Sequence, residues 1–352
     1  MTAAGRPRAE PRPPARLVEA LEASLDGPRR RALAAARAVS AARGEAVYLV
    51  GGAVRDLLLG RSAPDLDLVV AGDGSGFAGD LAALLDATCT RHRRFLTAVV
   101  SWPGGPRLDL ASSRREVYEA PGALPRVEPA PLAEDLARRD FTVNAMALEL
   151  APESGRLLDP HGGCEDLRRR LLRVLHPGSF LDDPTRIVRG LLFEHRFDLR
   201  FEPETERLAR GALADGGLAR LSRDRRSAAL APLLARLLEA PSLARRMGGL
   251  GLFAALHPEL APRAEEEGRL RRFADLRGEL AAASPPVEVA AEWAAAVALL
   301  WRRERAVWRA VGADLGLDAT ASELPRRVRR LSAALGAEGI PPHRVDALLR
   351  EL

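Results

Sequence analysis

The sequence predicts an α/β domain followed by a helical body. Between residues 46 and 112, short apolar segments alternate with amphipathic ones, as strands and helices do in a mixed fold. From about residue 132 the pattern becomes predominantly helical, interrupted by glycine-rich breaks. The length of 352 residues is sufficient for two or three domains.

Local signals place the elements in order along the chain. Helices are predicted at 16–25 and 29–44, and Gly44 is placed to end the second. The elements predicted next are a strand at 46–50, a helix at 53–60, a strand at 64–72, a helix at 77–87, and strands at 97–102 and 107–112. The expected parts are a disordered N-terminus at 1–15, a head at 16–150, a helical neck at 151–220, and a helical body at 221–352.

The composition is typical of a soluble globular protein with an excess of positive charge. Hydrophobic residues make up 47% of the chain and charged residues 29%. All 53 basic residues are arginine, and the net charge of +5 favours phosphate-bearing partners, although a merely basic protein fits equally well. The two cysteines form no CxxC pair, which argues against a disulfide framework or a zinc site. Without a secretory signal or a membrane-length apolar run, a cytoplasmic location is expected.

Two glycines separate the strand at 46–50 from the helix that follows it. Gly51 and Gly52 would let the backbone approach a phosphate closely, with helix N-terminal amides directed at it. Arg55, in the first turn of the helix, could add a charge-assisted hydrogen bond to the same anion. Taken alone, the pair also fits an ordinary tight turn beside a surface arginine.

Asp65 and Asp67 lie two residues apart in a predicted strand, so their side chains share one face. Two carboxylates so close resist joint ionisation unless a cation lies between them. Magnesium takes oxygen ligands and commonly combines one or two carboxylates with substrate phosphates. Asp109, in the strand at 107–112, could complete such a cluster. The pattern favours two-metal phosphoryl transfer over an exposed strand edge with two ordinary caps.

Four segments together resemble the class II tRNA nucleotidyltransferases. They are GGAVRDLLLG…DLDLVV at 51–70, EDLARRDFTVNAMAL at 134–148, LDPHGGCEDLRRRLLR at 158–173 and FLDDPTRIVRGLLF at 180–193. The family comprises bacterial CCA-adding enzymes, their CC- and A-adding relatives, and bacterial poly(A) polymerases. The resemblance covers about residues 45–200 and implies a polymerase-β-like nucleotidyltransferase head, with a small mixed sheet and helices, followed by an all-helical neck and body.

The resemblance assigns roles to the residues of the head. It implies that Asp65 and Asp67 hold catalytic Mg²⁺, and that the Gly-Gly turn, Arg55 and Arg139 contact the incoming nucleotide. Residues 138–148 are expected to form a phosphate-facing loop that runs into a helix. Without the family, the two arginines that begin this segment would be interpreted as surface charges.

The resemblance also implies that protein side chains replace a nucleic-acid template. Asp183 and Arg186 lie three apart, which would place them on the same side of a helix, where they could read the pairing edge of cytosine or adenine. Arg189 could reach phosphate or ribose. In isolation the pair fits a salt bridge on a solvated helix. The chain departs from the family pattern at Asp182, where glutamate is usual, and at Leu192, where arginine is usual.

The function that the resemblance implies is addition of C and A, or one of them, to the 3′ end of tRNA from CTP and ATP. The arginine-rich helical body would bind the tRNA backbone. Residues 111–135, with their prolines and glycines, are expected to form a mobile loop. The alternatives are a bacterial poly(A) polymerase and a non-catalytic RNA-binding relative. The number of nucleotides added and the oligomeric state are left open.

Overall fold

The computed structural model describes residues 16–62, 66–102, 107–151, 155–260 and 266–281, with a few positions between 295 and 315. Within these residues the chain forms two compact units. The first comprises residues 16–182 and 198–205, and the second comprises 183–197 and the described residues from 206 onward. The predicted disordered segment at 1–15 and the predicted metal ligand Asp65 lie outside the described residues.

The first unit is a mixed α/β domain, which confirms the predicted fold class of the head. Its helices are α1 (Leu17–Ser24), α2 (Gly27–Arg43), α3 (Gly52–Leu58), α4 (Gly74–Leu85), α5 (Leu132–Ala137), α6 (Gly163–Arg168) and α7 (Ser179–Asp182). Its strands are β1 (Val47–Val50), β2 (Leu66–Val70), β3 (Thr88–His92), β4 (Thr97–Ser101), β5 (Arg107–Ser112), β6 (Arg114–Val117), β7 (Arg126–Pro129), β8 (Ala147–Glu149), β9 (Leu157–Leu158), β10 (Leu171–Leu172) and β11 (Arg200–Phe201). Gly44, at φ +65°, ends α2 as the sequence predicts.

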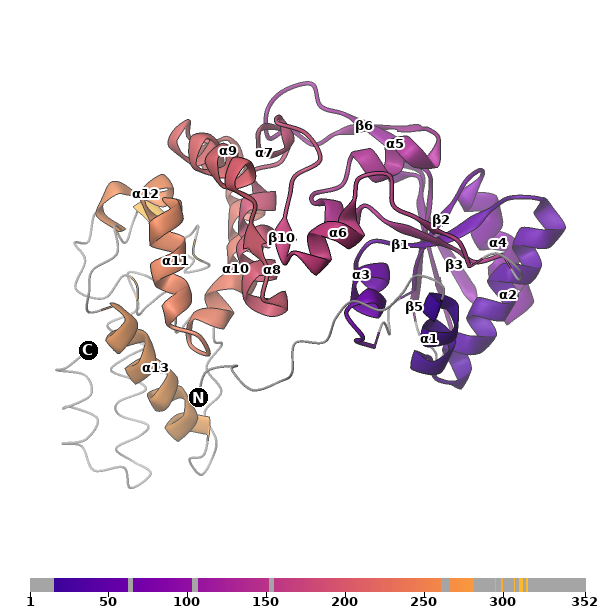
Figure 1. The fold of residues 1–352 in the computed structure, drawn as a ribbon, viewed down its shortest axis with the longest axis horizontal. Helices are drawn as coiled ribbons and strands as arrows, with labels where there is room; N and C mark the ends of the chain where they lie inside the picture. The colour runs from indigo at the N-terminus through magenta and orange to yellow at the C-terminus, as the bar shows by residue number, and fades with distance from the viewer. Residues whose placement is uncertain are drawn as a thin grey trace. The chain divides into compact units, whose positions relative to one another are not determined.

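Seven of these strands form one sheet in the order β3-β4-β5-β2-β1-β8-β9 (Figure 1). The neighbours β2 and β5 are parallel, and the other neighbouring pairs are antiparallel. The sheet is therefore mixed. Because β1 is antiparallel to β2 while β5 is parallel to it, the end of β1 and the starts of β2 and β5 meet at one edge.

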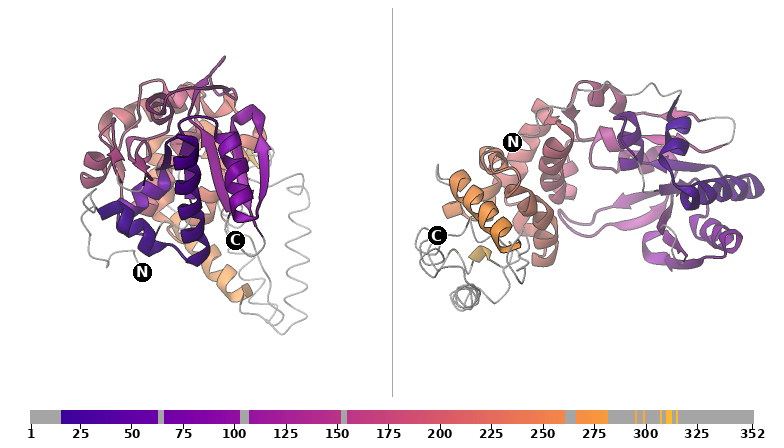
Figure 2. Two further views of the ribbon diagram at one scale, coloured as in Figure 1. Left: turned by 90° about the vertical axis from the view of Figure 1, so that its right-hand side faces the viewer. Right: turned by 90° about the horizontal axis from the view of Figure 1, so that it is seen from below.

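Helices cover both faces of this sheet (Figure 2). One face packs against α5 through a buried cluster, whose members are Tyr48, Val50, Val69, Leu136 and Ala147. The alternate residues of β2 and β5, including Leu68 and Leu110, point to the other face, where α4 contacts β4 and β5 and α2 contacts α4. Burial on both faces fixes the register of the central strands, because a slip of one residue would expose these side chains.

Two segments of the first unit differ from their predicted structure. Residues 111–135 contain an antiparallel hairpin of β6 and β7 rather than a loop without regular structure. The segment after Arg139 forms a 3₁₀ turn, η3 (Thr142–Asn144), and then strand β8, rather than a helix. Apolar runs such as the one around Met146 fit a buried strand and a buried helix equally well, so periodicity could not separate them.

The second unit is helical throughout its described residues. It contains α8 (Thr185–Phe197), most of α9 (Pro203–Ala214), α10 (Arg223–Leu237), α11 (Ser242–Leu250), α12 (Leu252–Leu256) and α13 (Glu266–Ala281), with 3₁₀ turns η4 (Leu218–Arg220) and η5 (Pro258–Leu260). The expected all-helical neck is wrong in detail, because β9 and the two-residue parallel pair β10–β11 lie within residues 151–220. Strands of two residues are too short to show the alternation of polar and apolar residues by which a strand is predicted from sequence.

Among the described residues, none of the helices has the length and apolar character needed to cross a bilayer.

Candidate active site

Three of the predicted site features lie at the same edge of the sheet. The Gly51–Gly52 turn follows the last residue of β1, Asp67 is the second residue of β2, and Asp109 is the third residue of β5. Strand pairing sets Asp67 directly opposite Asp109. Sheet topology therefore gathers a glycine turn and two carboxylates that are far apart in the sequence.

Asp67 and Asp109 are exposed, while the leucines on either side of each are buried. Because paired residues of neighbouring strands share a face, the two carboxylates lie side by side. Arg107 donates from Nε and Nη2 to Oδ1 of Asp109 at 3.0 and 2.8 Å. The described residues contain no group of three or more His, Cys, Asp or Glu side chains suited to a metal, and Asp65 lies outside them. The structure therefore brings together two of the three predicted carboxylates.

The Gly-Gly turn leaves room for two arginine side chains. Gly51 has φ +68°, and a Cβ added to it would lie 2.8 Å from Nη1 of Arg139. A Cβ on Gly52 would lie 3.3 Å from Nη2 of Arg55. The Gly51 N–H donates to the carbonyl of Met146 at 3.2 Å, which anchors the turn. Glycine is required at Gly51 both by its backbone conformation and by the approach of Arg139.

Arg55 is held in place by polar partners rather than lying free on the surface. Its side chain is only 5% exposed. Nη1 donates to Oδ1 of Asn144 at 2.6 Å, and Nε and Nη2 donate to Oδ1 of Asp56 at 2.9 and 2.8 Å. Asn144 in turn donates from Nδ2 to Oδ1 of Asp140 at 2.9 Å. Asn144 was not predicted from the sequence; it links the glycine turn to the segment that carries Arg139.

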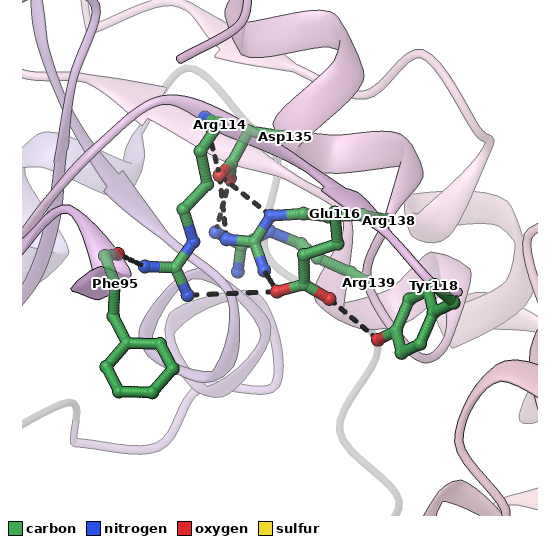
Figure 3. A network of polar contacts seen from close by, with 7 residues as sticks. All are labelled: Phe95, Arg114, Glu116, Tyr118, Asp135, Arg138 and Arg139. Atoms are coloured by element: carbon green, nitrogen blue, oxygen red, sulfur yellow. Dashed lines mark hydrogen bonds and ion pairs between the residues drawn. The ribbon is translucent and has the colours of Figure 1, made fainter. Parts of the chain in front are cut away.

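A buried carboxylate holds the two arginines that follow α5 (Figure 3). Asp135 is fully buried; its Oδ1 accepts from Nη2 of Arg138 at 2.7 Å, and its Oδ2 accepts from Nη2 of Arg139 at 2.9 Å. The two arginine side chains are 18% and 16% exposed. Interpreted without the family, they would be surface charges, and the structure shows that interpretation to be wrong. The i,i+3 and i,i+4 spacing from Asp135 is a sequence signal that could have found these pairs.

The hairpin β6–β7 supplies the other side of the same cluster (Figure 3). Glu116 accepts from Nη1 of Arg138 at 2.6 Å and from the hydroxyl of Tyr118 at 2.8 Å. Arg114 donates to the carbonyl of Phe95, and one of its nitrogens lies 3.8 Å from Glu116. Burial, followed by repulsion from Arg138, lowers the pKa of Arg114.

The residues expected to read the base belong to the second unit. Asp183 precedes α8, and its Oδ1 accepts from the N–H and hydroxyl of Thr185 at 3.1 and 2.8 Å and from Nη2 of Arg225 at 3.2 Å. Asp183 therefore lies at the N-terminal end of α8 rather than within the helix, where Pro184 follows it. Arg186 is 5% exposed, whereas Arg189 is exposed and lies over the ring of Phe193.

Because of the Asp135 carboxylate, the stability of the first unit should vary with pH in the acid range. Burial alone would raise the pKa of Asp135, but the charges and hydrogen bonds of Arg138 and Arg139 outweigh it, so the pKa lies below its usual 3.8. A carboxyl whose pKa is lower in the folded state stabilises the fold above its unfolded pKa. This stabilisation is lost as the pH falls through the folded value.

We therefore expect Asp135→Asn to lower the thermal midpoint at about pH 7 and to lose part of this difference from the wild type at about pH 3. Thermal unfolding followed by circular dichroism at several pH values measures the difference. A difference in thermal midpoint between the wild type and Asp135→Asn that stays constant down to the lowest pH would contradict the lowered pKa of Asp135.

Comparison with known proteins identifies the family. A family model described as the poly A polymerase head domain matches residues 47–173. An A-adding tRNA nucleotidyltransferase from Geobacter sulfurreducens is 44% identical over 61% of this chain and 24% of its own length. A CC-adding tRNA nucleotidyltransferase from Deinococcus radiodurans is 46% identical over 44% of this chain and 42% of its own length. The chain thus matches less than half the length of these curated relatives.

A solved structure of a CCA-adding enzyme in an apo form agrees over most of both chains. It is 33% identical, covers 96% of this chain and 80% of its own, and superposes with a TM-score of 0.79. The similarity thus extends over nearly the whole length of this chain, beyond the head domain that the family model matches. The chain belongs to the class II tRNA nucleotidyltransferase family, which includes the CCA-adding enzymes and the bacterial poly(A) polymerases.

Proposed function

We propose that this protein is a template-independent nucleotidyltransferase that adds C, A or both to the 3′ end of tRNA, using CTP and ATP. The observation that carries the proposal is the sheet edge at which Arg55 and Arg139 meet the Gly51–Gly52 turn, beside the paired carboxylates Asp67 and Asp109. Phosphoryl transfer needs both parts, since the first can bind phosphate and the second can bind a cation.

The glycine turn would hold the triphosphate of the incoming nucleotide. Its backbone can approach a phosphate closely, and the first turn of α3 presents N–H groups to an anion. Arg55 and Arg139 add positive charge at the same place, and their protein partners fix their direction. Pre-oriented donors avoid the cost of ordering the side chains at the moment of binding.

The paired carboxylates fit a hard divalent cation such as Mg²⁺. Asp67 and Asp109 offer oxygen ligands on a solvent-exposed face, and Asp65 is the third ligand that we assign from the family motif. When bound, magnesium supplies Lewis acidity toward the attacking hydroxyl and neutralises charge on the triphosphate. In the reaction the 3′ oxygen of the RNA loses its proton and bonds to the α-phosphorus. The bond from the α-phosphorus to the bridging oxygen breaks, and pyrophosphate leaves.

The base would be chosen by protein side chains of the second unit. We propose that Asp183 accepts from the exocyclic amine that cytosine and adenine share, and that Arg186 donates to the ring acceptors of the base. Asp183 is suited to this because its Oδ1 is already fixed by Thr185 and Arg225. Arg189 would contact phosphate or ribose, and Leu192 removes the additional arginine that the family usually carries here.

The helical second unit would bind the tRNA backbone through arginine side chains. Residues 220–226 include four arginines, of which Arg220 and Arg223 are exposed. The similarly basic segment 326–331 lies outside the described residues. Such contacts recognise phosphate rather than sequence, which suits an enzyme that accepts all tRNAs. Because tRNA, CTP and ATP are cytoplasmic molecules, we propose that the protein acts in the cytoplasm.

Poly(A) addition is the second candidate function, because the family model that matches the head is that of poly A polymerases. The two activities differ in product length. A non-catalytic RNA-binding relative would form no product at all.

The test uses tRNA transcripts that end at the discriminator base, after one C, and after both Cs. Each is incubated with Mg²⁺ and CTP, ATP or both, and the products are separated at single-nucleotide resolution. Completion of CCA on all three transcripts identifies a CCA-adding enzyme. Arrest after CC, or activity only on the CC-ended transcript, identifies a CC- or A-adding enzyme. Long A tails support the poly(A) candidate, and no product in any reaction overturns the proposal.

In the same assay, Asp67→Asn should reduce incorporation about a thousandfold, because losing a metal ligand removes several kcal/mol of transition-state stabilisation. Asp80→Asn serves as the control, since that exposed carboxylate lies on α4, on the other face of the sheet, and pairs with Arg43. Normal incorporation by Asp67→Asn would remove Asp67 from the metal site.

Gly51→Ala tests the phosphate turn, and Gly44→Ala, at another glycine with positive φ, is its control. Both glycines have positive φ, at +68° and +65°, but Gly44 lies in the left-handed helical region at ψ 22°, where alanine costs about 1 kcal/mol, whereas Gly51 at ψ −127° has a conformation that is essentially restricted to glycine, so its substitution should cost more. Only the methyl group at Gly51 would meet a side chain, that of Arg139, since nothing lies within 4 Å of a Cβ at Gly44. We expect a larger loss in thermal midpoint for Gly51→Ala than for Gly44→Ala and, at a temperature where both variants are folded, an affinity for Mg-ATP lowered about tenfold only in Gly51→Ala. Equal affinities in calorimetry would show that the turn does not bind the nucleotide.

A further inference from the structure

The carboxylate of Asp135 is buried at a cost that only its partners can offset. An ionised carboxyl removed from water needs paired charges and hydrogen bonds. Besides its bonds to Arg138 and Arg139, this carboxylate accepts at Oδ1 from the backbone N–H of Arg114 at 3.3 Å. The backbone N–H ties this carboxylate to the hairpin as well as to the residues that follow α5.

The two oxygens of Asp135 direct two arginines differently. Oδ1 accepts from Arg138, whose Nη1 donates to Glu116 of the hairpin. Oδ2 accepts from Nη2 of Arg139, and the other terminal nitrogen of that guanidinium lies against Gly51. Because a guanidinium is planar and rigid, fixing one terminal nitrogen restricts where the other can lie. Asp135 thereby sets the direction in which Arg139 meets the glycine turn.

The cluster carries more positive than negative charge. Arg114, Arg138 and Arg139 face the carboxylates of Asp135 and Glu116, which leaves a formal excess of one positive charge. Arg139 is the member of this cluster that reaches the turn. An excess charge next to a phosphate-binding turn favours an anion there.

We propose that Asp135 is a positioning residue for the incoming nucleotide: it orients Arg139 beside Gly51 so that its guanidinium is set for the triphosphate before binding. This role rests on the proposed function, because it assumes that the glycine turn binds a nucleotide. The same carboxylate also binds Arg138, which donates to Glu116 of the hairpin, so Asp135 connects the hairpin to the nucleotide site.

The test compares Asp135→Asn with Glu116→Gln, which is matched in chemistry and in the charge removed. Both substitutions take one carboxylate from the same three-arginine cluster, but Glu116 contacts Arg138, Arg114 and Tyr118 and makes no hydrogen bond or ion pair with Arg139 within the described residues. Asp135→Glu, which keeps the charge, is the conservative variant. Steady-state kinetics give KM and kcat for CTP and ATP and KM for tRNA, and calorimetry without RNA gives the dissociation constant of Mg-ATP.

We expect Asp135→Asn to raise the nucleotide KM and the Mg-ATP dissociation constant about 10- to 100-fold, since small misplacements of a binding group have effects of this size. KM for tRNA should change less than about threefold, and Asp135→Glu should recover part of the loss. Glu116→Gln should leave the nucleotide KM within about threefold of the wild type, even where its thermal midpoint falls equally. If Asp135→Asn does not fold, Asp135→Glu takes its place, with a smaller rise in the same two constants.

Two results would overturn the positioning role while the proposed function stands. One is a wild-type protein that adds nucleotides to tRNA while Asp135→Asn, or Asp135→Glu in its place, binds Mg-ATP equally well. The other is a nucleotide KM raised as much by Glu116→Gln as by Asp135→Asn, which would indicate a purely structural cluster. A wild-type protein that binds Mg-ATP but adds nothing to any transcript would overturn the proposed function alone. A wild-type protein that neither binds nor transfers a nucleotide would overturn both.

Discussion

The parallel pairing of β2 with β5 is the constraint on which the candidate site depends. It sets Asp67 opposite Asp109, and the antiparallel partner β1 delivers the Gly51–Gly52 turn to the same edge. Burial of the intervening leucines makes this register costly to change, so the hydrophobic core fixes the positions of the charged groups. The resulting arrangement has carboxylates for a cation beside a turn that can accept phosphate.

Arginine side chains complete this edge, and each of them is oriented by a specific partner. Arg55 is fixed by Asp56 and Asn144, and Arg139 is fixed by Asp135. Hydrogen bonds that would be weak in water gain strength when the groups are buried, so the donors are directed before a ligand arrives.

The local sequence predicted the elements around the site because their signals are short-range. The strand before Gly51, the alternation around Asp67 and the glycine that ends α2 all appear in the structure. The buried network of Asp135 was not predicted, because it joins α5 to a hairpin that turn-forming residues had made look like a loop. Asp183 was predicted to lie on the helix, whereas α8 begins at Thr185 and Asp183 precedes it. The glycine turn, Asp67 and Asp109 come together through the pairing of strands that are distant in the sequence, and no local pattern predicts that pairing.

The most direct measurement is a crystal structure with Mn²⁺ and a non-hydrolysable ATP analogue. Manganese accepts the same oxygen ligands as magnesium and can be located by anomalous scattering. We expect an anomalous peak next to Asp67 and Asp109, with the triphosphate against the Gly51–Gly52 turn and within hydrogen-bonding distance of Arg139. A nucleotide bound with its triphosphate elsewhere, or manganese away from both carboxylates, would contradict this expectation.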